Sequence, residues 1–402
     1  MRLSLIAVII TILAASSVSA QQRLVDEVKK DISSMTITAD GYKKAKAKLL
    51  PALSHDATAR KAGTWWVAAS IDLGIYDKLI TTRQLCTKVE PIELGNALID
   101  GYDMMAKALS LDTTFLRDNA GNIRLDKRGN PRFKTKFSKR IMRALYSRLL
   151  DYSSVGGELF LAGDMNRASK AWGIYCDLAL SPQAQLHKVN EPDSIIGYYR
   201  YYQGLADYQA GHFADALIHF RQAEKLGFVK KRMYDTWIDA AIKQHDTILT
   251  VAVAEVAHER YGDRDSKYLR ILINDRLTRE RYSEALTLLQ EALKRDPNNA
   301  EYHDLMGQIV ELLYSPADAL KHYRHAVQLE PDYATAQFDL GNALYRIALN
   351  EQQPRSDSAM ALYLEAADHV ERAYNLGLRD DNTKMVLARL YYLLGSDKID
   401  NL

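Results

Sequence analysis

The chain has 402 residues, with 53 basic and 51 acidic side chains and a formal net charge of +2. This balance excludes a strong whole-chain field for nucleic acid or anionic membranes. Two cysteines are too few for a disulfide framework, and their state stays open: Cys86 and Cys176 either form one bridge or remain separate buried thiols.

The first 20 residues predict a secretory signal. Arg2 precedes an apolar run over residues 3–15, and small residues occupy 18–20. The run is shorter than the ~20 apolar residues that span a bilayer. We therefore expect cleavage before Gln21 and an exported chain with no transmembrane segment left. A periplasmic location is the first expectation, with secretion or outer-membrane association as alternatives.

From residue 24 onward, apolar residues recur at the helical period and strand-like alternation is nearly absent. The expected fold class is all-α. Residues 21–190 are expected to form helical hairpins with long inserts between them.

A basic loop is expected within this part, at residues 113–136. The wider segment 117–143 carries ten basic residues against two acidic ones. Its Asp, Asn, Gly and Pro residues predict a loop or small hairpin with turns near 120–122 and 127–131. Two interpretations stay open: a docking site for an acidic partner or for lipid or glycan phosphates, and a solvated excursion between two helices.

Further along, the sequence repeats itself with a period near 34 residues. Aligning internal small residues gives successive spacings of 34, 35, 34 and 34. The repeats start at Gly197, Lys231, Ser266, Ala300 and Ala334.

Within this register, small and bulky residues take complementary positions. The eighth position holds Gly204, Gly307 and Gly341, and the twenty-fourth holds Phe220 and Tyr323 in two of the same units. Two antiparallel helices pack closely where one offers a small side chain and the other a bulky one. The pattern therefore predicts helix pairs.

These units resemble the tetratricopeptide repeat family, most clearly in RYSEALTLLQEALKRDPNN and SPADALKHYRHAVQLEPDY. The resemblance implies an α-solenoid of antiparallel helix pairs over residues 191–402, with the hairpins of 21–190 as divergent relatives. Ile238 and Ile273 depart from the small eighth position. Repeats are expected near 197–230, 231–265, 266–299, 300–333 and 334–379, with an insertion at 350–358 and a capping helix at 381–395.

The whole chain is similar to exported tetratricopeptide proteins of the Bacteroidota type. That resemblance implies an O-glycosylation sequon, Asp-Ser/Thr-aliphatic or Asp-Thr-Thr, which recurs in this sequence. Ser194 and Ser358 are the possible O-glycosylation sites, because both are expected in loops where a glycan is tolerated.

Enzymatic motifs are missing from the sequence, including the nucleophile elbow and the phosphate-binding loops. His258 and Glu259 begin a zinc-type pair, but Gly262 stands where the second histidine is needed. His322 and His325 could reach a metal with a third histidine, yet a solvated helix surface is the better explanation. We expect no catalytic, cofactor-binding or metal-binding residues, and no enzyme.

In the resembled family, the concave groove is formed by the second, fifth, ninth and twelfth positions of each first helix. The groove residues expected here to contact a partner are Tyr198, Tyr201, Leu205, Tyr208, Arg270, Asn274, Gln308, Phe338, Asn342 and Tyr345. An alternative is that the protein's own insertions fill the groove.

The family's carboxylate clamp for chaperone peptides can be compared position by position. Arg270 and Asn274 match two of its positions, but Leu305, Thr335 and Asp339 stand where the others are needed. A chaperone-type clamp is therefore not expected.

The resulting hypothesis is a non-enzymatic exported scaffold that binds another envelope protein or peptide through the groove, and not nucleic acid. The alternative is a glycan-binding or peptidoglycan-binding protein that uses the groove tyrosines, since aromatic faces stack on sugars. The partner and the oligomeric state stay open.

Overall fold

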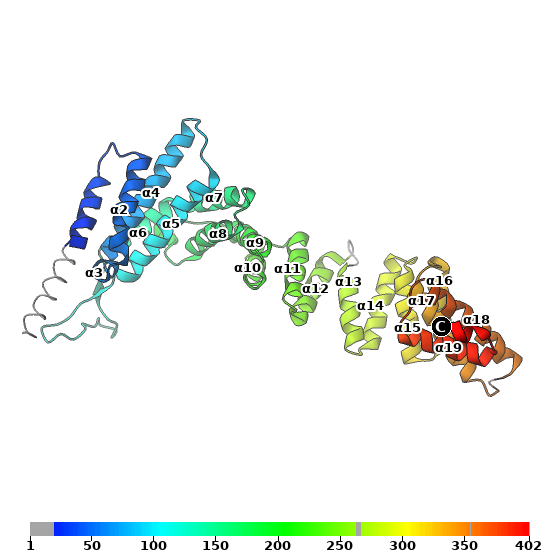
Figure 1. Cartoon of the computed structure of the whole chain (residues 1–402). Coiled ribbons are helices and arrows are strands. Elements are labelled where there is room, and N and C mark those ends of the chain that lie inside the picture. Colours follow the sequence, from blue (N-terminus) through cyan, green and yellow to red (C-terminus); the bar gives the residue numbers. More distant parts are fainter. Residues whose placement is uncertain (1–19, 263–266, 354, 402) are drawn as a thin grey trace, which may run out of the picture. The chain divides into compact units, whose positions relative to one another are not determined.

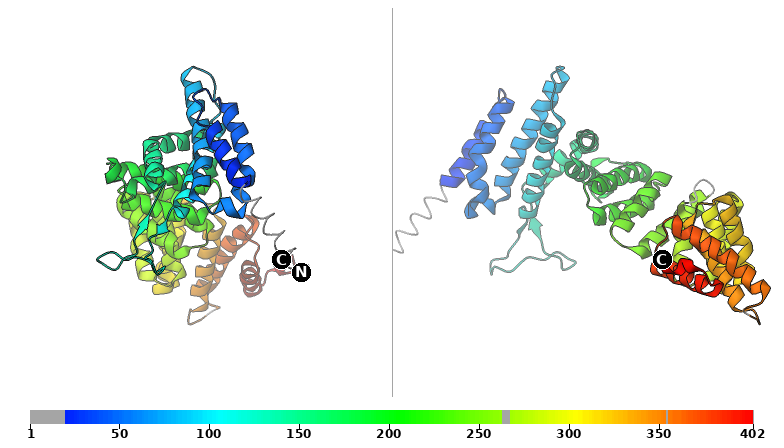
Figure 2. Two further views of the ribbon diagram at one scale, coloured as in Figure 1. Left: turned by 90° about the vertical axis from the view of Figure 1, so that its left-hand side faces the viewer. Right: turned by 45° about the vertical axis from the view of Figure 1, so that its right-hand side comes forward.

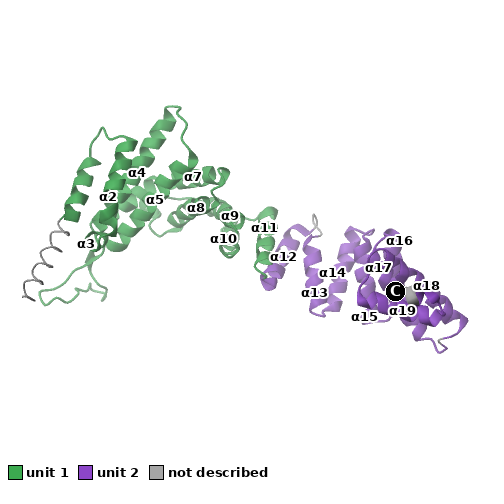
Figure 3. Ribbon diagram, in the orientation of Figure 1, with its two compact units in different colours: residues 1–245 green, residues 246–402 purple. Residues whose placement is uncertain are grey.

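The computed structural model describes residues 20–262, 267–353 and 355–401, so the predicted signal lies outside the described residues except for Ala20. Two compact units divide the chain, residues 1–245 and 246–402 (Figure 3). Helices make up almost all of the regular structure in the described ranges (Figure 1), which confirms the all-α fold class. None of the described helices is long and apolar enough to cross a membrane.

The first unit begins with a helix over residues 20–31. Its further helices are α2 (Ala39–Ser54), α3 (Asp56–Ala59), α4 (Ala62–Gln84), α5 (Pro91–Leu111), α6 (Ser138–Ser147), α7 (Leu149–Leu161), α8 (Met165–Leu180), η1 (Gln185–His187), α9 (Asp193–Gln209), α10 (Phe213–Lys225) and α11 (Lys231–Lys243). The first repeat, α9 and α10, lies in this unit, where Tyr199 packs edge-on against Tyr175 of α8 with 4.7 Å between ring centroids.

The second unit contains α12, which is the second helix of the second repeat, and all of the later repeats. Its helices are α12 (Thr247–Tyr261), α13 (Lys267–Thr278), α14 (Tyr282–Arg295), α15 (Ala300–Leu313), α16 (Pro316–Leu329), α17 (Ala334–Leu349), α18 (Asp357–Asn375), α19 (Asp381–Leu394) and η3 (Asp397–Asn401). The expected helix pairs α13–α14, α15–α16 and α17–α18 are present, and α19 follows as the expected last helix.

The one sheet in the described residues is a short hairpin between α5 and α6. Strand β1 (Thr114–Phe115) pairs antiparallel with β2 (Phe133–Lys134). Tight turns occupy 118–122 and 126–130, which confirms the two turns that the sequence predicts.

Helix starts follow from local chemistry. The side chains of Asp164, Asp246, Ser315 and Asp380 accept a hydrogen bond from a backbone N–H in the first turn of α8, α12, α16 and α19. Each satisfies a donor that has no partner inside the helix. Gly395 ends α19 in the left-handed conformation, with φ of 62°.

Close helix pairing depends on the predicted glycines. A Cβ at Gly204 would lie 2.9 Å from the Phe220 ring, and one at Gly307 would lie 2.5 Å from the Tyr323 ring. The eighth and twenty-fourth positions of a repeat therefore do meet, as the sequence predicts.

The largest fully buried side chains are mostly tyrosines. They are Tyr152, Tyr175, Tyr234, Tyr268, Tyr302, Tyr323 and Tyr363. Two of them donate from the ring tip to a carboxylate, Tyr234 to Glu224 at 2.6 Å and Tyr323 to Glu311 at 2.8 Å. Much of the tyrosine is thus core filling, and in these two residues the buried ring also keeps its hydroxyl paired.

Both cysteines are free thiols, so the disulfide alternative is wrong for this structure. Cys176 is buried, whereas Cys86 is exposed in the turn after α4. Cys86 has a φ of 62°, because the chain reverses there to reach α5. The expectation that both thiols are buried is therefore wrong for Cys86.

Candidate interaction surfaces

The first expected groove residue, Tyr198 on α9, is exposed. Its side chain has 41% of its surface accessible, and its ring lies 4.7 Å from the ring of Tyr202. A hydrogen bond with Tyr202, together with partial burial, raises the pKa of Tyr198 to about 12. Tyr198 therefore offers a neutral, immobilised aromatic face to solvent.

Tyr201 and Leu205 do not share that exposure, which corrects the expectation of one open stripe along α9. Tyr201 is 5% exposed because its ring stacks on Phe228 of the following loop, at 4.8 Å and 19°. Leu205 is 7% exposed. The loop between α10 and α11 thus covers part of the α9 face that was expected to contact a partner.

Tyr208 is half-buried at the same face. Its hydroxyl donates a hydrogen bond to Asp239 of α11, and this bond raises the pKa of Tyr208 to about 12. The first helices of these two repeats therefore lie side by side and are joined through groove positions.

In the second unit, α13 presents the expected polar pair. Arg270 and Asn274 are exposed one turn apart, and the Arg270 guanidinium lies 4.0 Å from a Glu301 carboxylate oxygen on α15. An ion pair this long and exposed contributes little to stability. Both side chains remain available to a ligand.

The remaining expected residues are more enclosed. Gln308 and Asn342 are half-buried, whereas Phe338 and Tyr345 of α17 are each 8% exposed and belong to the core of the second unit. Tyr345 lies 6.1 Å from Tyr363 of α18. The prediction of two exposed aromatic anchors at this end is thus wrong, because neighbouring helices cover them.

Beside Tyr345, an apolar recess of about 350 Å³ opens between α17, α19 and η3. Tyr392, which is 77% exposed, stands at its edge. The recess has few polar groups that could orient a ligand.

Gln308 joins two carboxyl groups, of which Asp304 is buried and Asp339 is half-buried. Its amide nitrogen donates to Asp304 at 3.2 Å and to Asp339 of α17 at 2.8 Å. Burial, and then the charge of Asp339, raise the pKa of Asp304 to about 8, while burial raises the pKa of Asp339 to about 6. The sequence predicts that both residues lie on first helices, but it does not predict how far they are buried.

The three histidines considered as metal ligands do come together. The His303 ring lies 4.3 Å from His325 and 6.4 Å from His322, between α15 and α16. His322 and His325 are half-buried, so the expectation of a solvated surface pair is wrong. Burial, followed by Lys321 and the two other histidines, lowers the pKa of His322. In the described ranges, no group of three or more His, Cys, Asp or Glu could hold a metal ion.

Ser194 and Ser358 are both exposed, but neither lies in a loop. Each is in the first turn of a helix, α9 and α18 respectively. Asp and Ser are favoured at helix starts, and this preference explains the difference from expectation. The Ser358 hydroxyl donates to Glu351 at 2.9 Å.

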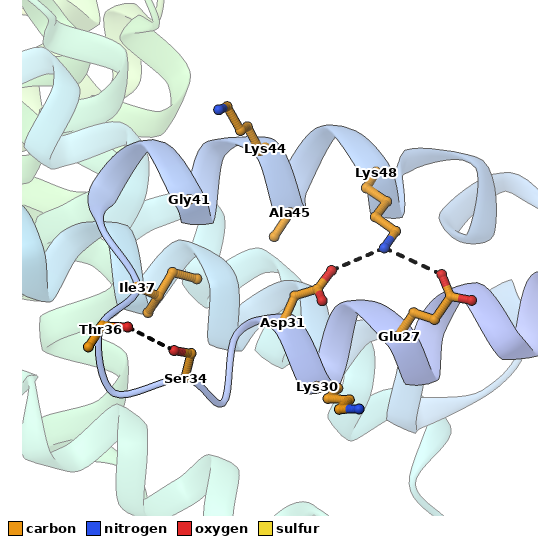
Figure 4. A pocket seen from close by; sticks show the side chains of 10 residues that line it. All are labelled: Glu27, Lys30, Asp31, Ser34, Thr36, Ile37, Gly41, Lys44, Ala45 and Lys48. Atoms are coloured by element: carbon orange, nitrogen blue, oxygen red, sulfur yellow. Dashed lines mark hydrogen bonds and ion pairs between the residues drawn. The ribbon is translucent and has the colours of Figure 1, made fainter.

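A large open recess lies between the first helix and α2 (Figure 4). Lys48 spans it, with its ammonium 3.1 Å from Asp31 and 3.4 Å from Glu27, while Lys30 and Lys44 point away. Its one central ammonium is thus already paired with two carboxylates of this chain.

One buried Asp–His pair was not foreseen. His219 Nδ1 of α10 lies 2.6 Å from Asp207 of α9, and both side chains are largely buried. Such a pair can orient a base in an enzyme. Here it joins the two helices of one repeat, beside the contact between Gly204 and Phe220.

These features define a helical repeat protein built from antiparallel helix pairs with partly open first-helix faces. Two family models match parts of the second unit: "TPR repeat" matches residues 317–347, and "Tetratricopeptide repeat" matches residues 272–311. The chain therefore contains tetratricopeptide repeats in its second unit.

The solved structures that resemble this chain share little of its sequence. MamA MSR-1 is 17% identical, with 46% of this chain and 98% of that chain covered and a TM-score of 0.34. PilF of Pseudomonas aeruginosa is 15% identical, with 52% and 90% covered and a TM-score of 0.39. The TPR2AB domain of yeast Sti1, in complex with pHSP90, is 14% identical, with 62% and 99% covered and a TM-score of 0.26. No curated protein matches the sequence.

Proposed function

We propose that this chain is a non-enzymatic exported scaffold that binds a protein or peptide of the cell envelope through the first-helix face of its repeats. The observation that carries the proposal is the set of tetratricopeptide repeats with Arg270 and Asn274 left exposed on α13. Repeats of this kind present extended surfaces to partners, and charged and amide side chains orient a bound peptide.

Only some of the expected groove residues are accessible to a partner. Arg270, Asn274 and, in the first unit, Tyr198 are accessible, whereas Tyr201 and Phe338 are buried. In the second unit a partner would therefore meet polar side chains at α13, and the aromatic ring at α9 belongs to a separate surface of the first unit. The glycan-binding alternative loses support, because stacking on sugars needs exposed ring faces.

The first-helix face can be tested by site-specific photo-crosslinking in the natural cell. We expect a crosslinker at Asn274 to capture one defined protein, and one at Gln290, on the exposed surface of the second helix α14, to capture none. Arg270→Ala should abolish the capture at Asn274 with helicity unchanged. Equal capture from both positions would place the contact elsewhere.

Export is supported by the sequence of residues 1–20 and has a separate test. We expect protein isolated from its natural cell to begin at Gln21, as measured by mass spectrometry of the amino-terminal peptide. A mature protein that still begins at Met1 would contradict export by signal cleavage. It would not affect the proposal that the repeats bind a partner.

A further inference from the structure

The basic hairpin is held firmly to the first unit. Asp112, at the end of α5, accepts hydrogen bonds from the backbone amides of Lys136 at 3.0 Å, Phe137 at 2.7 Å and Ser138 at 2.7 Å. Burial alone would raise the pKa of Asp112, but these bonds and one from the Ser138 hydroxyl hold it below its ordinary value. The carboxylate also lies at the amino terminus of α6, where negative charge is favoured.

Beyond this point the chain extends away from the helices, as the ribbon views show (Figure 1 and Figure 2). The segment repeats an eight-residue turn pattern, LRDNAGNI over 116–123 and RLDKRGNP over 124–131. Each copy places Asp, Gly and Asn at the same offsets, with Gly121 and Gly129 at φ of 87° and 84°. The repeated pattern gives two equivalent turns.

Three backbone hydrogen bonds join the copies to the return strand. Arg124 N donates to Leu116 O at 2.8 Å, Arg132 N to Arg124 O at 2.7 Å, and Leu116 N to Arg132 O at 2.8 Å. The three segments thus close on one another. Their side chains are presented from a defined backbone.

The two acidic residues of the hairpin accept backbone hydrogen bonds within its turns. Asp118 Oδ1 accepts from the amides of Ala120 and Asn122, both at 2.9 Å, and Asp126 makes the same two contacts in its own turn. These backbone bonds lower the pKa of both carboxyls. Arg124 and Arg132 lie close enough to Asp118 and Asp126, respectively, to favour their charged forms.

Basic side chains outnumber these acids by seven to two across 113–136. All seven are exposed: Arg117, Arg124, Lys127, Arg128, Arg132, Lys134 and Lys136. The Arg117 guanidinium donates to Gly121 O at 2.7 Å within its own turn. The hairpin is therefore a local cationic surface on a chain that is close to neutral.

The same hairpin exposes large apolar side chains. Phe115 and Phe133 are paired across the strands and are 46% and 58% exposed, while Ile123 and Leu125 are 38% and 57% exposed. Phe133 also borders a recess of about 630 Å³, to which Met142 and other residues near α6 contribute. Apolar and cationic groups thus share one surface.

We propose that the hairpin over 113–136 and its adjoining recess bind the surface of a bilayer that contains anionic phospholipids. Exposed apolar side chains enter the boundary between headgroups and acyl chains, while nearby Arg and Lys side chains meet lipid phosphates. This inference is independent of the first-helix face, since the hairpin and every residue that lines the recess precede α9.

The combination of groups favours a bilayer over an acidic protein segment. An acidic segment would pair with the cations, but it offers no apolar boundary for Leu125 and Phe133. A bilayer surface accommodates both kinds of side chain at once and needs no matched shape. The chain's small net charge also leaves this local patch as the source of attraction.

The test is co-sedimentation of the chain from Gln21 onward with vesicles of equal parts phosphatidylglycerol and phosphatidylcholine. Starting at Gln21 keeps the apolar run at 3–15 from binding lipid itself. We expect binding at about 0.1 M salt, little at about 1 M salt, and little to pure phosphatidylcholine. Lys127→Glu with Arg128→Glu should weaken binding by roughly tenfold or more.

Two further variants separate the contributions. Leu125→Ser with Phe133→Ser should also weaken vesicle binding, although it leaves every charge in place. Lys30→Glu with Lys44→Glu makes the same charge change as the hairpin variant at the recess in Figure 4, and we expect it to bind normally. Helical circular dichroism confirms that each variant is folded.

Several outcomes would overturn the proposal. These are no binding to the anionic vesicles, equal binding to both vesicle types, or an equal loss in the Lys30 and Lys44 variant. Binding to soluble polyglutamate without binding to vesicles would also overturn it and would assign the hairpin to an acidic protein.

Discussion

Replacing Gly341 with alanine should lower the free energy of unfolding of the second unit by about 1–3 kcal/mol, the usual cost of overpacking. A Cβ at this position would lie 2.6 Å from Val370 Cγ2 and 2.8 Å from the backbone oxygen of Ala366, both on α18. A side chain can rotate away from such a contact, but a backbone carbonyl cannot. Helices α17 and α18 would therefore have to separate.

The distribution of tryptophan makes this loss measurable in one unit. The four tryptophans are Trp65, Trp66, Trp172 and Trp237, all in the first unit. During denaturant unfolding, Gly341→Ala should lower the denaturant concentration at which the second unit loses its helical circular dichroism. The transition followed by tryptophan fluorescence, which reports on the first unit, should keep its midpoint. A fluorescence shift of equal size would mean that the damage is not local.

Gly157→Ala is the matched control. It makes the same substitution inside a helix, α7, but no atom lies within 4 Å of the added Cβ. We expect a gain of about 0.5–1 kcal/mol from higher helix propensity. If both alanines stabilised their units, close helix approach would not be the reason for Gly341.

The sequence could predict this packing because its cause lies within one repeat. Gly307 and Tyr323 are 16 positions apart, a separation that a helix, a tight turn and a second helix reproduce in each unit. Gly204 and Phe220 have the same separation and make the same contact. The 34-residue period and the glycine and aromatic positions within it were therefore enough to predict the helix pairs.

The repeat pattern could not predict which residues of the first-helix face are exposed to solvent. Whether Tyr201 is exposed depends on Phe228, which belongs to the linking loop and has no fixed place in the repeat register. Tyr345 is covered because α18 and α19 pack against α17 in the last unit. A repeat register assigns a face to each residue, but the accessibility of that face is set by contacts between repeats.

Burial of the Asp304 carboxyl has the same origin, and it leads to a strong pH dependence. Asp304 is 1% exposed, and its Oδ1 has no hydrogen-bond partner among the described residues. Its pKa of about 8 exceeds its ordinary value of 3.8, so the folded unit retains a proton that the unfolded chain releases near pH 4. The stabilisation from this protonated form is therefore present at low pH and is lost as the pH rises through about 8.

We expect the second unit to lose stability as the pH rises from about 4 to about 8, with a slope approaching 1.4 kcal/mol per pH unit for one proton. Asp339 contributes in the same direction at lower pH, because burial raises its pKa to about 6. His322 acts oppositely: its lowered pKa makes stability fall as the pH drops below its ordinary 6.5. The loss from the two carboxyls therefore begins near pH 4, and the histidine opposes it only below its ordinary 6.5.

Asp304→Asn should remove much of the alkaline loss, because the amide keeps the shape of the side chain but cannot ionise. We expect the variant to be nearly as stable as the natural chain near pH 4 and more stable by about 3 kcal/mol or more at pH 8. Thermal unfolding followed by helical circular dichroism across this pH range measures the effect. Asp332→Asn makes the same change on a side chain that is 80% exposed, and we expect it to leave the pH profile unaltered.

The neighbours of Asp304 determine how this result is interpreted. Glu301 faces it from its own helix, and the charge of Asp339 on α17 adds to its burial. If Asp304→Asn left the alkaline slope intact while Asp339→Asn removed it, the retained proton would belong to Asp339. If neither variant changed the slope, Gln308 would be joining two ionised carboxylates, and the burial of this pair would not control the stability of the unit.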